Sequence, residues 1–506
     1  MHKLGRKMKA IEELNVAHVL NSGSFAVVYA CDIGVYKHFK TIEVENSYEA
    51  NRFIPLELSI LRALQHVPFF VQLEDIIIDK EIVSGITMTR YKQDLNSYIK
   101  NTQYKDHKVI QKIMYHLVSA LYYLHSINIL HGDIKPGNIL IDHNKNAVLC
   151  DFNSCHALSP VNRKSLNYRY TYTLWYRPPE IFLQRKINLQ ADVWSLGIVF
   201  AEIFFGRIGI LATREELEDD YASHHNIFMR QLSYFGTPHE YSSIYQAYKP
   251  RYEYFFKKIG ITEDKMLCDF LRSMLQIMPH QRNSPKQLLD HNYFSTIPKI
   301  IPCKTPIGVI EEANILNNTP YKNYYQEMNN LKNILQQTLT ESYKYCSLTT
   351  LQYEVFHFAH YIFVLTNNNQ YSVNFQLGVC TIIALKILDP TNYFIDTSSY
   401  EKSEEYEQEL LISLDYKLHF QNTLYYKMHQ DGPLTQIQNN LLYATLFSSY
   451  PEEFTTTDEV KRKILEYANG KNNEEKYYKD LQKILAKNES TLKDIKNESN
   501  KQHKPL

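Results

Sequence analysis

Four polar residues that could handle a phosphoryl group lie close together in the sequence. Asp133, Lys135 and Asn138 fall within "HGDIKPGN", and Asp151 follows in "VLCDFN". Phosphoryl transfer needs few protein groups, because its catalysis is mostly positioning and neutralisation of charge. A plain Gly/Pro turn between a helix and a strand would also explain "HGDIKPGN", but the four residues occurring together in this order favour a catalytic site.

The order of motifs around these residues resembles a eukaryotic protein kinase over roughly residues 14–295. By this resemblance, Asp133 is the base that accepts the proton of the substrate hydroxyl, and Lys135 neutralises the γ-phosphate. Asn138 and Asp151 would be the metal ligands, with ATP and Mg²⁺ as the cofactors. The resemblance implies an α+β bilobal fold, with a β-rich N-lobe and a helical C-lobe.

The N-terminal part carries further nucleotide contacts by the same resemblance. "LNSGSFAVVY" resembles the glycine-rich loop, although a plain β-hairpin explains this segment about as well. "VYKHF" puts Lys37 at the lysine that holds the α- and β-phosphates, and "LELSILRALQH" puts Glu57 at its carboxylate partner. Taken singly, Lys37 could be a solvated strand residue and Glu57 a residue at the boundary of a helix. "RYKQDL" resembles the hinge, with Met88 as gatekeeper. The implied nucleotide-binding residues are Ser22, Gly23, Ser24, Val28, Lys37, Met88, Tyr91 and Asp94.

Motifs in the second half narrow the resemblance to cyclin-dependent and MAP kinases. "TLWYRPPE" matches their segment almost letter for letter, with Thr173 at the threonine that bridges the catalytic aspartate and lysine. "YFGTPHE" matches the cyclin-dependent group. Glu180 and Arg282 fall on the family's buried ion pair, and Asp192 on the residue that steadies the catalytic loop. By resemblance, Arg177 implies a preference for proline after the target Ser/Thr.

Three of the departures from the family pattern fall in the catalytic loop, in the activation segment and after Asp151. Gly132 stands at the arginine that binds a phosphorylated activation-loop threonine, and Tyr168 stands at that threonine. Both partners of one switch are changed, whereas the groups that touch ATP or metal remain. This favours an active kinase that is independent of activating phosphorylation. The alternative is a catalytically weak, ATP-binding pseudokinase scaffold, a non-catalytic interaction protein. Asn153 replaces the glycine of D-F-G, and we expect it to tolerate an unusual backbone geometry there.

A second region, residues 320–425, resembles a single cyclin box. "NFQLGVCTIIALKILDP" and "YEQELLISLDYKLHF" resemble successive helices of that box, and Lys386 and Glu407 fall on the residues that contact the kinase αC region. The resemblance implies an all-α cyclin-like domain that activates the kinase within one chain. A generic helical bundle, with both residues as solvated charges, is the alternative. We expect a proline-containing linker at 296–319, and a helical extension with a charged, partly disordered tail at 426–506.

The composition excludes several classes of partner. The 506 residues carry 55 Lys and Arg against 55 Asp and Glu, so no electrostatic footprint points to nucleic acid or an acidic membrane. Seven cysteines without a C-x-x-C pair indicate a reducing compartment and no zinc or disulfide framework. We recognise no secretory signal and no membrane span. We therefore expect an intracellular protein, cytoplasmic or nuclear, that acts on protein substrates.

Overall fold

The computed structural model describes most of the first 298 residues and helices beyond residue 350. No helix among these residues has the length and apolar character needed to cross a membrane. Ser24, Tyr168, most of the expected linker and the whole of the expected tail lie outside the described residues. The described ranges are 9–10, 14–23, 26–40, 54–65, 67–79, 82–102, 106–126, 129–157, 172–183, 187–213, 224–298, single positions from 355 to 366, 371–388, 403–414 and 416.

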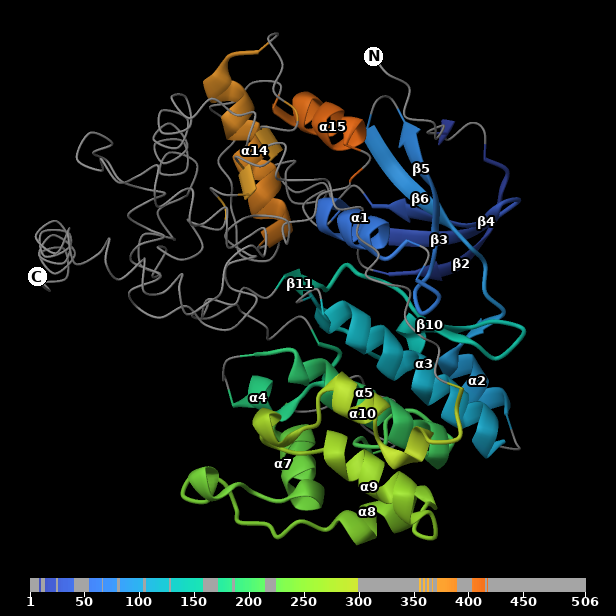
Figure 1. Ribbon diagram of the computed structural model, residues 1–506, viewed down its shortest axis with the longest axis vertical. Coiled ribbons are helices and arrows are strands. Elements are labelled where there is room, and N and C mark those ends of the chain that lie inside the picture. The colour runs from blue at the N-terminus through green and yellow to red at the C-terminus, as the bar shows by residue number, and fades with distance from the viewer. Residues whose placement is uncertain are drawn as a thin grey trace, which may run out of the picture.

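A six-stranded sheet forms the upper, N-terminal lobe in Figure 1. Its strand order is β1-β5-β6-β4-β3-β2, and only the pair β1–β5 is parallel. Helix α1 (Ile54–Ala63) lies beside the sheet, and its apolar residues Leu56, Leu58, Ile60 and Leu61 belong to the main hydrophobic core. The strands are β1 (Lys9–Ala10), β2 (Val16–Ser22), β3 (Ala26–Cys31), β4 (Gly34–Phe39), β5 (Leu73–Asp79) and β6 (Ile82–Met88).

Helices form the lower lobe. Helix α3 (His107–Ser126) carries apolar residues at helical spacing, and these residues therefore lie in the core. Helix α5 (Gln190–Phe205) is apolar nearly all round and is therefore buried along most of its length. It ends at Gly206, whose φ of 83° suits a glycine cap. The other helices are α2 (Leu95–Asn101), α4 (Pro179–Phe182), α7 (His224–Phe235), α8 (Tyr252–Ile259), α9 (Lys265–Met274) and α10 (Pro285–Leu289).

Two small sheets lie between the lobes and set the positions of two polar loops. In one, β9 (Ile139–Ile141) pairs with β10 (Ala147–Leu149) and with β7 (Gln93–Asp94). In the other, β8 (Ile129–Leu130) pairs with β11 (His156–Ala157), antiparallel. Because β8 leads into residues 131–138 and β10 leads into residues 150–155, the two loops lie beside each other.

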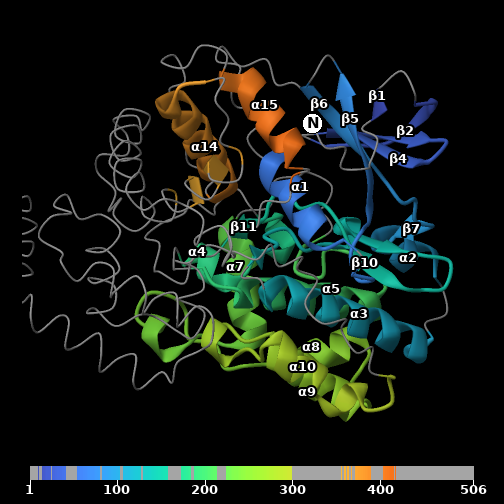
Figure 2. The same cartoon turned by 45° about the horizontal axis from the view of Figure 1, so that its top comes forward.

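Two further helices lie beside α1 (Figures 1 and 2). Helix α14 (Val373–Leu388) contacts both α1 and β11, and α15 (Ser403–Ser413) contacts α14 and β6. Buried residues of α14 belong to the same hydrophobic core as those of α1. The two charged residues singled out in this region bond to each other: Lys386 Nζ lies 2.6 Å and 2.8 Å from the carboxylate oxygens of Glu407, and both residues are buried. Neither residue makes a hydrogen bond or an ion pair with α1 among the described residues.

Candidate active site

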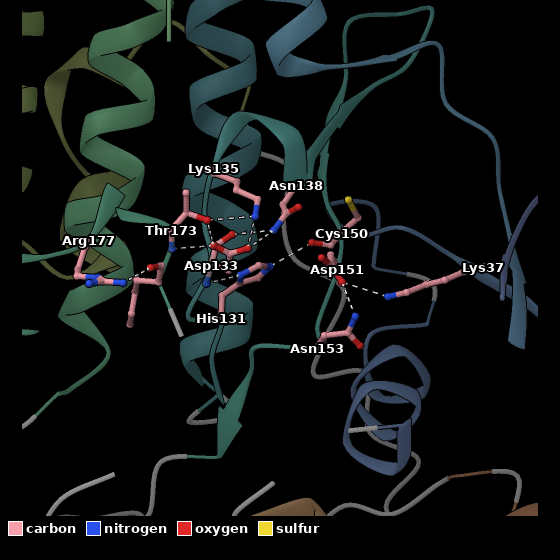
Figure 3. A network of polar contacts seen from close by, with 11 residues as sticks. Lys37, His131, Asp133, Lys135, Asn138, Cys150, Asp151, Asn153, Thr173 and Arg177 are labelled. Carbon is pink, nitrogen blue, oxygen red and sulfur yellow. Dashed lines mark hydrogen bonds and ion pairs between the residues drawn. The ribbon is translucent and has the colours of Figure 1, made fainter. Parts of the chain in front are cut away.

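A network of hydrogen bonds surrounds the carboxylate of Asp133 (Figure 3). Lys135 Nζ donates to Oδ2 at 2.6 Å, and the side-chain amide of Asn138 donates to the same oxygen at 3.0 Å. Thr173 Oγ1 donates to Oδ1 at 2.7 Å and accepts from Lys135 Nζ at 3.1 Å. Thr173 therefore bridges Asp133 and Lys135, as the motifs predicted, although these residues are up to 40 positions apart in the sequence.

A second network is centred on Lys37 in β4. Its Nζ lies 2.6 Å from Glu57 Oε1 in α1 and 3.1 Å from Asp151 Oδ1. Burial alone would lower the pKa of Lys37, but the two carboxylates outweigh it and raise that pKa. Burial would likewise raise the pKa of Asp151, and the Lys37 ammonium reverses this, so that the pKa of Asp151 lies below its ordinary value. The expected contact between Lys37 and Glu57 is present, and it joins the sheet, α1 and the loop after β10.

The backbone around Asp151 differs from the expectation. Asp151 has the left-handed φ of 65°, whereas Asn153 does not have a positive φ. The prediction that Asn153 accommodates unusual backbone geometry was therefore wrong. Its side-chain amide instead donates to Asp151 Oδ1 at 3.0 Å (Figure 3). Sequence reasoning missed this contact because it concerns a side chain two residues away, and nothing in the local pattern indicates where that side chain lies.

Asp192 at the start of α5 fixes the backbone of the loop that carries Asp133. Its buried carboxylate accepts from the backbone N–H of His131 at 2.8 Å and of Gly132 at 3.1 Å. The ring of His131 accepts from Asp133 N at Nδ1, so its Nε2 carries the hydrogen and donates to the Cys150 carbonyl at 3.2 Å. His131 was not among our candidates, although it is the first residue of "HGD" and could have been chosen with that motif.

Gly132 occupies a backbone position that leaves no room for a side chain. Its φ is +77°, a value that L-residues rarely adopt, and a Cβ built there would lie 2.5 Å from the carbonyl oxygen of Ser154. Gly132 thus has a steric role, because it lets two backbones approach closely. The sequence identified only the missing arginine at this position.

The comparisons with known proteins agree with this geometry. Residues 14–294 match the family model for the protein kinase domain, which is more than half of the chain. The chain belongs to the protein kinase family. Members of this family use ATP and Mg²⁺. The expected β-sheet N-lobe and helical C-lobe are both present.

Similar proteins include kinases of the two groups that the motifs indicated. The chain is 29% identical over 283 residues to mitogen-activated protein kinase homolog 1 of Petunia hybrida, covering 50% of this chain and 66% of the relative. It is 30% identical over 283 residues to mitogen-activated protein kinase homolog NTF3 of Nicotiana tabacum, covering 50% and 68%. It is 30% identical over 302 residues to cyclin-dependent kinase C-1 of Oryza sativa subsp. japonica, covering 52% and 54%. The matches thus span between about half and two thirds of these relatives.

Two side-chain oxygens of the kinase domain are suitable ligands for a magnesium ion. Both oxygens of Asp133 accept hydrogen bonds, but among the described residues neither Asn138 Oδ1 nor Asp151 Oδ2 has a hydrogen-bond donor. One carboxylate and one amide oxygen are hard ligands, and Mg²⁺ is commonly held by one or two protein carboxylates together with substrate phosphates and water. Asn138 and Asp151 are therefore the residues that would hold the ion, and this assignment stays a prediction.

The candidate phosphate-covering loop lies at the tip of the β2–β3 hairpin. Ser22 ends β2, and the Gly23 N–H donates to the carbonyl of Ala26 at 2.9 Å. Lys40 Nζ donates to the Gly23 carbonyl at 2.6 Å. Val28 lies opposite Lys37 in the pairing of β3 with β4. The strand pairing thus places Ser22 opposite Val27 and Val28 opposite Lys37, on three neighbouring strands.

The candidate hinge follows β6. Met88 is the last residue of that strand and pairs with Val35 across β4, and Tyr91 is half-buried three residues later. Asp94 has a local role as well, because its carboxylate accepts from the Ser97 N–H at 2.6 Å and so caps the N-terminus of α2. The segment between Met88 and Asp94 therefore connects the two lobes.

The family's buried ion pair is also present. Arg282 donates to Glu180 through two nitrogens, at 2.8 Å and 2.7 Å, and both residues are almost completely buried. Arg282 also lies over the ring of Trp194, with 5.2 Å between the guanidinium carbon and the ring centroid. A bidentate pair with this geometry joins the segment around α4 to the end of the kinase domain.

Proposed function

We propose that this chain is an active serine/threonine protein kinase, which transfers the γ-phosphate of ATP to Ser or Thr side chains of protein substrates. The observation that carries the proposal is the Lys37 network. One ammonium contacts both Glu57 in α1 and Asp151 in the loop after β10. A scaffold without catalytic activity would not need to keep three charged side chains from separate elements in contact.

The remaining side chains supply the steps of the transfer. Asp133 accepts the proton of the substrate hydroxyl, and Thr173 and Asn138 hold its carboxylate in position. Lys135 neutralises charge on the γ-phosphate side, and Lys37 binds the α- and β-phosphates. When bound at Asn138 and Asp151, Mg²⁺ would neutralise negative charge on the phosphate oxygens.

The experiment compares three variants in transfer of radiolabelled phosphate from ATP to a generic protein substrate. Lys37→Met and Asp133→Asn should each abolish transfer while the protein stays folded, because they remove the phosphate contact and the base. Lys108→Met, at an exposed position on α3, is the matched control and should keep wild-type activity. If the wild type binds ATP but transfers no phosphate, the chain is a pseudokinase scaffold.

We propose further that the kinase prefers proline after the target residue. Arg177 is buried and donates from Nη2 to the carbonyl of Tyr172 at 2.8 Å. Tyr172 directly precedes Thr173, which contacts Asp133, so this carbonyl lies at the edge of the acceptor site. A carbonyl that already accepts from a guanidinium is a poor partner for the backbone N–H of the following substrate residue. Proline has no such N–H and loses nothing.

A pair of peptides tests this preference. The peptides differ only in proline or alanine after the target serine, and kcat/KM is measured for each. The wild type should favour the proline peptide, and Arg177→Lys should reduce the ratio, because lysine cannot reproduce the planar contact. A ratio near one for the wild type would contradict the preference.

We also propose that the C-terminal helices activate the kinase domain in cis, as a cyclin-like region would. Support comes from α14, which contacts both α1, the helix of Glu57, and β11, which follows the Asp151 loop. The buried pair of Lys386 and Glu407 joins α14 to α15, and α15 in turn contacts β6 of the N-lobe. Helices held this way would keep Glu57 against Lys37.

Removing the C-terminal region tests the activation. A truncation that ends near residue 305 should fold, as judged by thermal unfolding, and bind ATP, but transfer phosphate poorly. Adding a fragment of residues 306–506 should restore part of the activity. A high concentration of the fragment is needed, because the tether no longer supplies a millimolar effective concentration. A truncated kinase as active as the full chain would show that the region has another role, such as docking of a substrate or partner.

A further inference from the structure

Asn153 makes a contact that the family pattern does not provide. The third residue of D-F-G is ordinarily glycine, which has no side chain. Here the side-chain amide of Asn153 donates to Asp151 Oδ1 at 3.0 Å. Lys37 Nζ lies 3.1 Å from the same oxygen (Figure 3). Two donors thus meet on one oxygen of the carboxylate. Within the described part of the chain, no donor meets the other oxygen, Oδ2.

The backbone conformation and exposure of Asp151 leave its carboxylate weakly restrained. Asp151 adopts a φ of 65°, which non-glycine residues reach only at a cost, although aspartate tolerates it better than most. The side chain of Asp151 is 38% exposed, so packing alone does not fix its rotamer. A hydrogen bond from Asn153, two residues later in the same loop, restrains both the rotamer and the turn that carries it.

Asn153 is not merely a tolerated replacement for glycine. Its own φ is not positive, so the position does not use the conformational freedom of glycine. A residue kept only because it fits would have no reason to place its amide on the carboxylate that faces the metal position. Asn138 offers a parallel, because its amide donates to Asp133 and leaves its own carbonyl oxygen for the metal.

We infer that Asn153 is a positioning residue for the divalent-cation site: it holds Oδ1 of Asp151 together with Lys37, so that Asp151 presents Oδ2 alone to the metal. The inference rests on the proposed function in one respect, namely that Asp151 is a metal ligand. It goes further by assigning a role in metal affinity to a side chain that does not touch the metal. The consequence is a single-oxygen ligand with a fixed direction, which favours the strict geometry of a small cation such as Mg²⁺.

The experiment measures metal binding without catalysis. Mn²⁺ is titrated into the full-length chain in the presence of a non-hydrolysable ATP analogue, and free Mn²⁺ is followed by electron paramagnetic resonance. Asn153→Ala removes the donor, and Asn153→Leu removes it while keeping nearly the same side-chain shape. Asn144→Ala, at an exposed position in the turn between β9 and β10, is the matched control.

Both donor-free variants should bind Mn²⁺ at least about 10-fold more weakly than the wild type, since the hydrogen bond that orients a metal-binding carboxylate is lost. The affinity for the analogue without metal, and the KM for a peptide substrate, should stay within about twofold, because Asn153 is inferred to act only through the metal-binding carboxylate. Asn144→Ala should bind Mn²⁺ as the wild type does. Asn153→Gly, which restores the ordinary family residue and should fold, should show the same loss.

Three results would overturn the inference. Wild-type Mn²⁺ affinity in all three Asn153 variants would show that the contact does not matter. A loss in Asn153→Ala but not in Asn153→Leu would show that Asn153 acts by filling space. A wild-type chain that binds no Mn²⁺ with the analogue would overturn the proposed function itself and this inference with it, whereas an active wild type with unaffected variants overturns the inference alone.

Discussion

Gly132→Ala offers a direct test of why the kinase lacks the arginine of its catalytic loop. At a φ of +77°, an alanine costs about 1–2 kcal/mol relative to glycine. Its Cβ would also lie 2.5 Å from the Ser154 carbonyl oxygen, closer than real Cβ atoms come, so one of the two backbones must move. Such a shift in a packed region costs roughly 1–3 kcal/mol. The sum is a loss of about 2–5 kcal/mol in the free energy of unfolding.

The assay is thermal unfolding combined with phosphotransfer. For a domain of this size, each kcal/mol lowers Tm by about 2–4 °C, so we expect Gly132→Ala to melt roughly 5–15 °C below the wild type. Activity should fall as well, because Gly132 directly precedes Asp133 and its N–H is bound by Asp192. Gly137→Ala in the same loop is the matched control, because a Cβ there meets nothing within 4 Å.

The same reasoning covers the family residue itself. Gly132→Arg should be at least as destabilising as Gly132→Ala, and it should not produce a kinase that depends on phosphorylation. If Gly132→Ala melts and turns over like Gly137→Ala, the close approach to Ser154 is not a constraint. The only consequence of the glycine at position 132 would then be the absence of the arginine.

Three further predictions follow from the same residues and contacts. Phosphatase treatment should leave most of the activity, because Gly132 and Tyr168 cannot form the usual phosphate–arginine contact; a large loss would contradict this. Burial raises the pKa of Glu202 from 4.5 to about 7, so between these values the folded protein retains a proton that the unfolded chain releases. The unfolding free energy of the wild type should therefore fall from pH 5 to pH 8 by up to about 3 kcal/mol more than that of Glu202→Gln, measured by urea unfolding. Lys386→Ala combined with Glu407→Ala should lower phosphotransfer like the truncation, whereas either single change should unfold the C-terminal helices more, since it leaves one buried charge unpaired.

Much of the site could be predicted from the sequence because its residues belong to short motifs with fixed spacing. Asp133, Lys135 and Asn138 occupy one turn, so their proximity is already set by the local chain. Lys37, Glu57 and Thr173 are distant in sequence, and only the resemblance to a family could place them near that turn. The helix α3 was predictable because apolar residues recur along it at helical spacing.

The departures from the family pattern were not predictable in the same way. The sequence shows that Asn153 and Gly132 are unusual, but their effects depend on atoms that tertiary folding brings together. The amide of Asn153 acts on Asp151, and the absent side chain of Gly132 makes room for Ser154. Local propensity described Asn153 as a residue that tolerates left-handed backbone, and the structure gives that backbone to Asp151 instead.

These departures meet at one place, the junction between the catalytic loop and the segment that follows Asp151. Gly132 lets the loop touch the Ser154 backbone, Asn153 restrains Asp151, and β11 pairs with β8 directly beyond them. Helix α14 then contacts β11 on one side and α1 on the other. A phosphorylated threonine held by an arginine would fix this same junction, but any side chain at position 132 would place its Cβ 2.5 Å from the Ser154 carbonyl oxygen. If the C-terminal helices hold this junction as we propose, we expect it not to respond to activating phosphorylation. The loss of the arginine, the glycine that replaced it and the contact of α14 are therefore expected to stand or fall together in the experiments above.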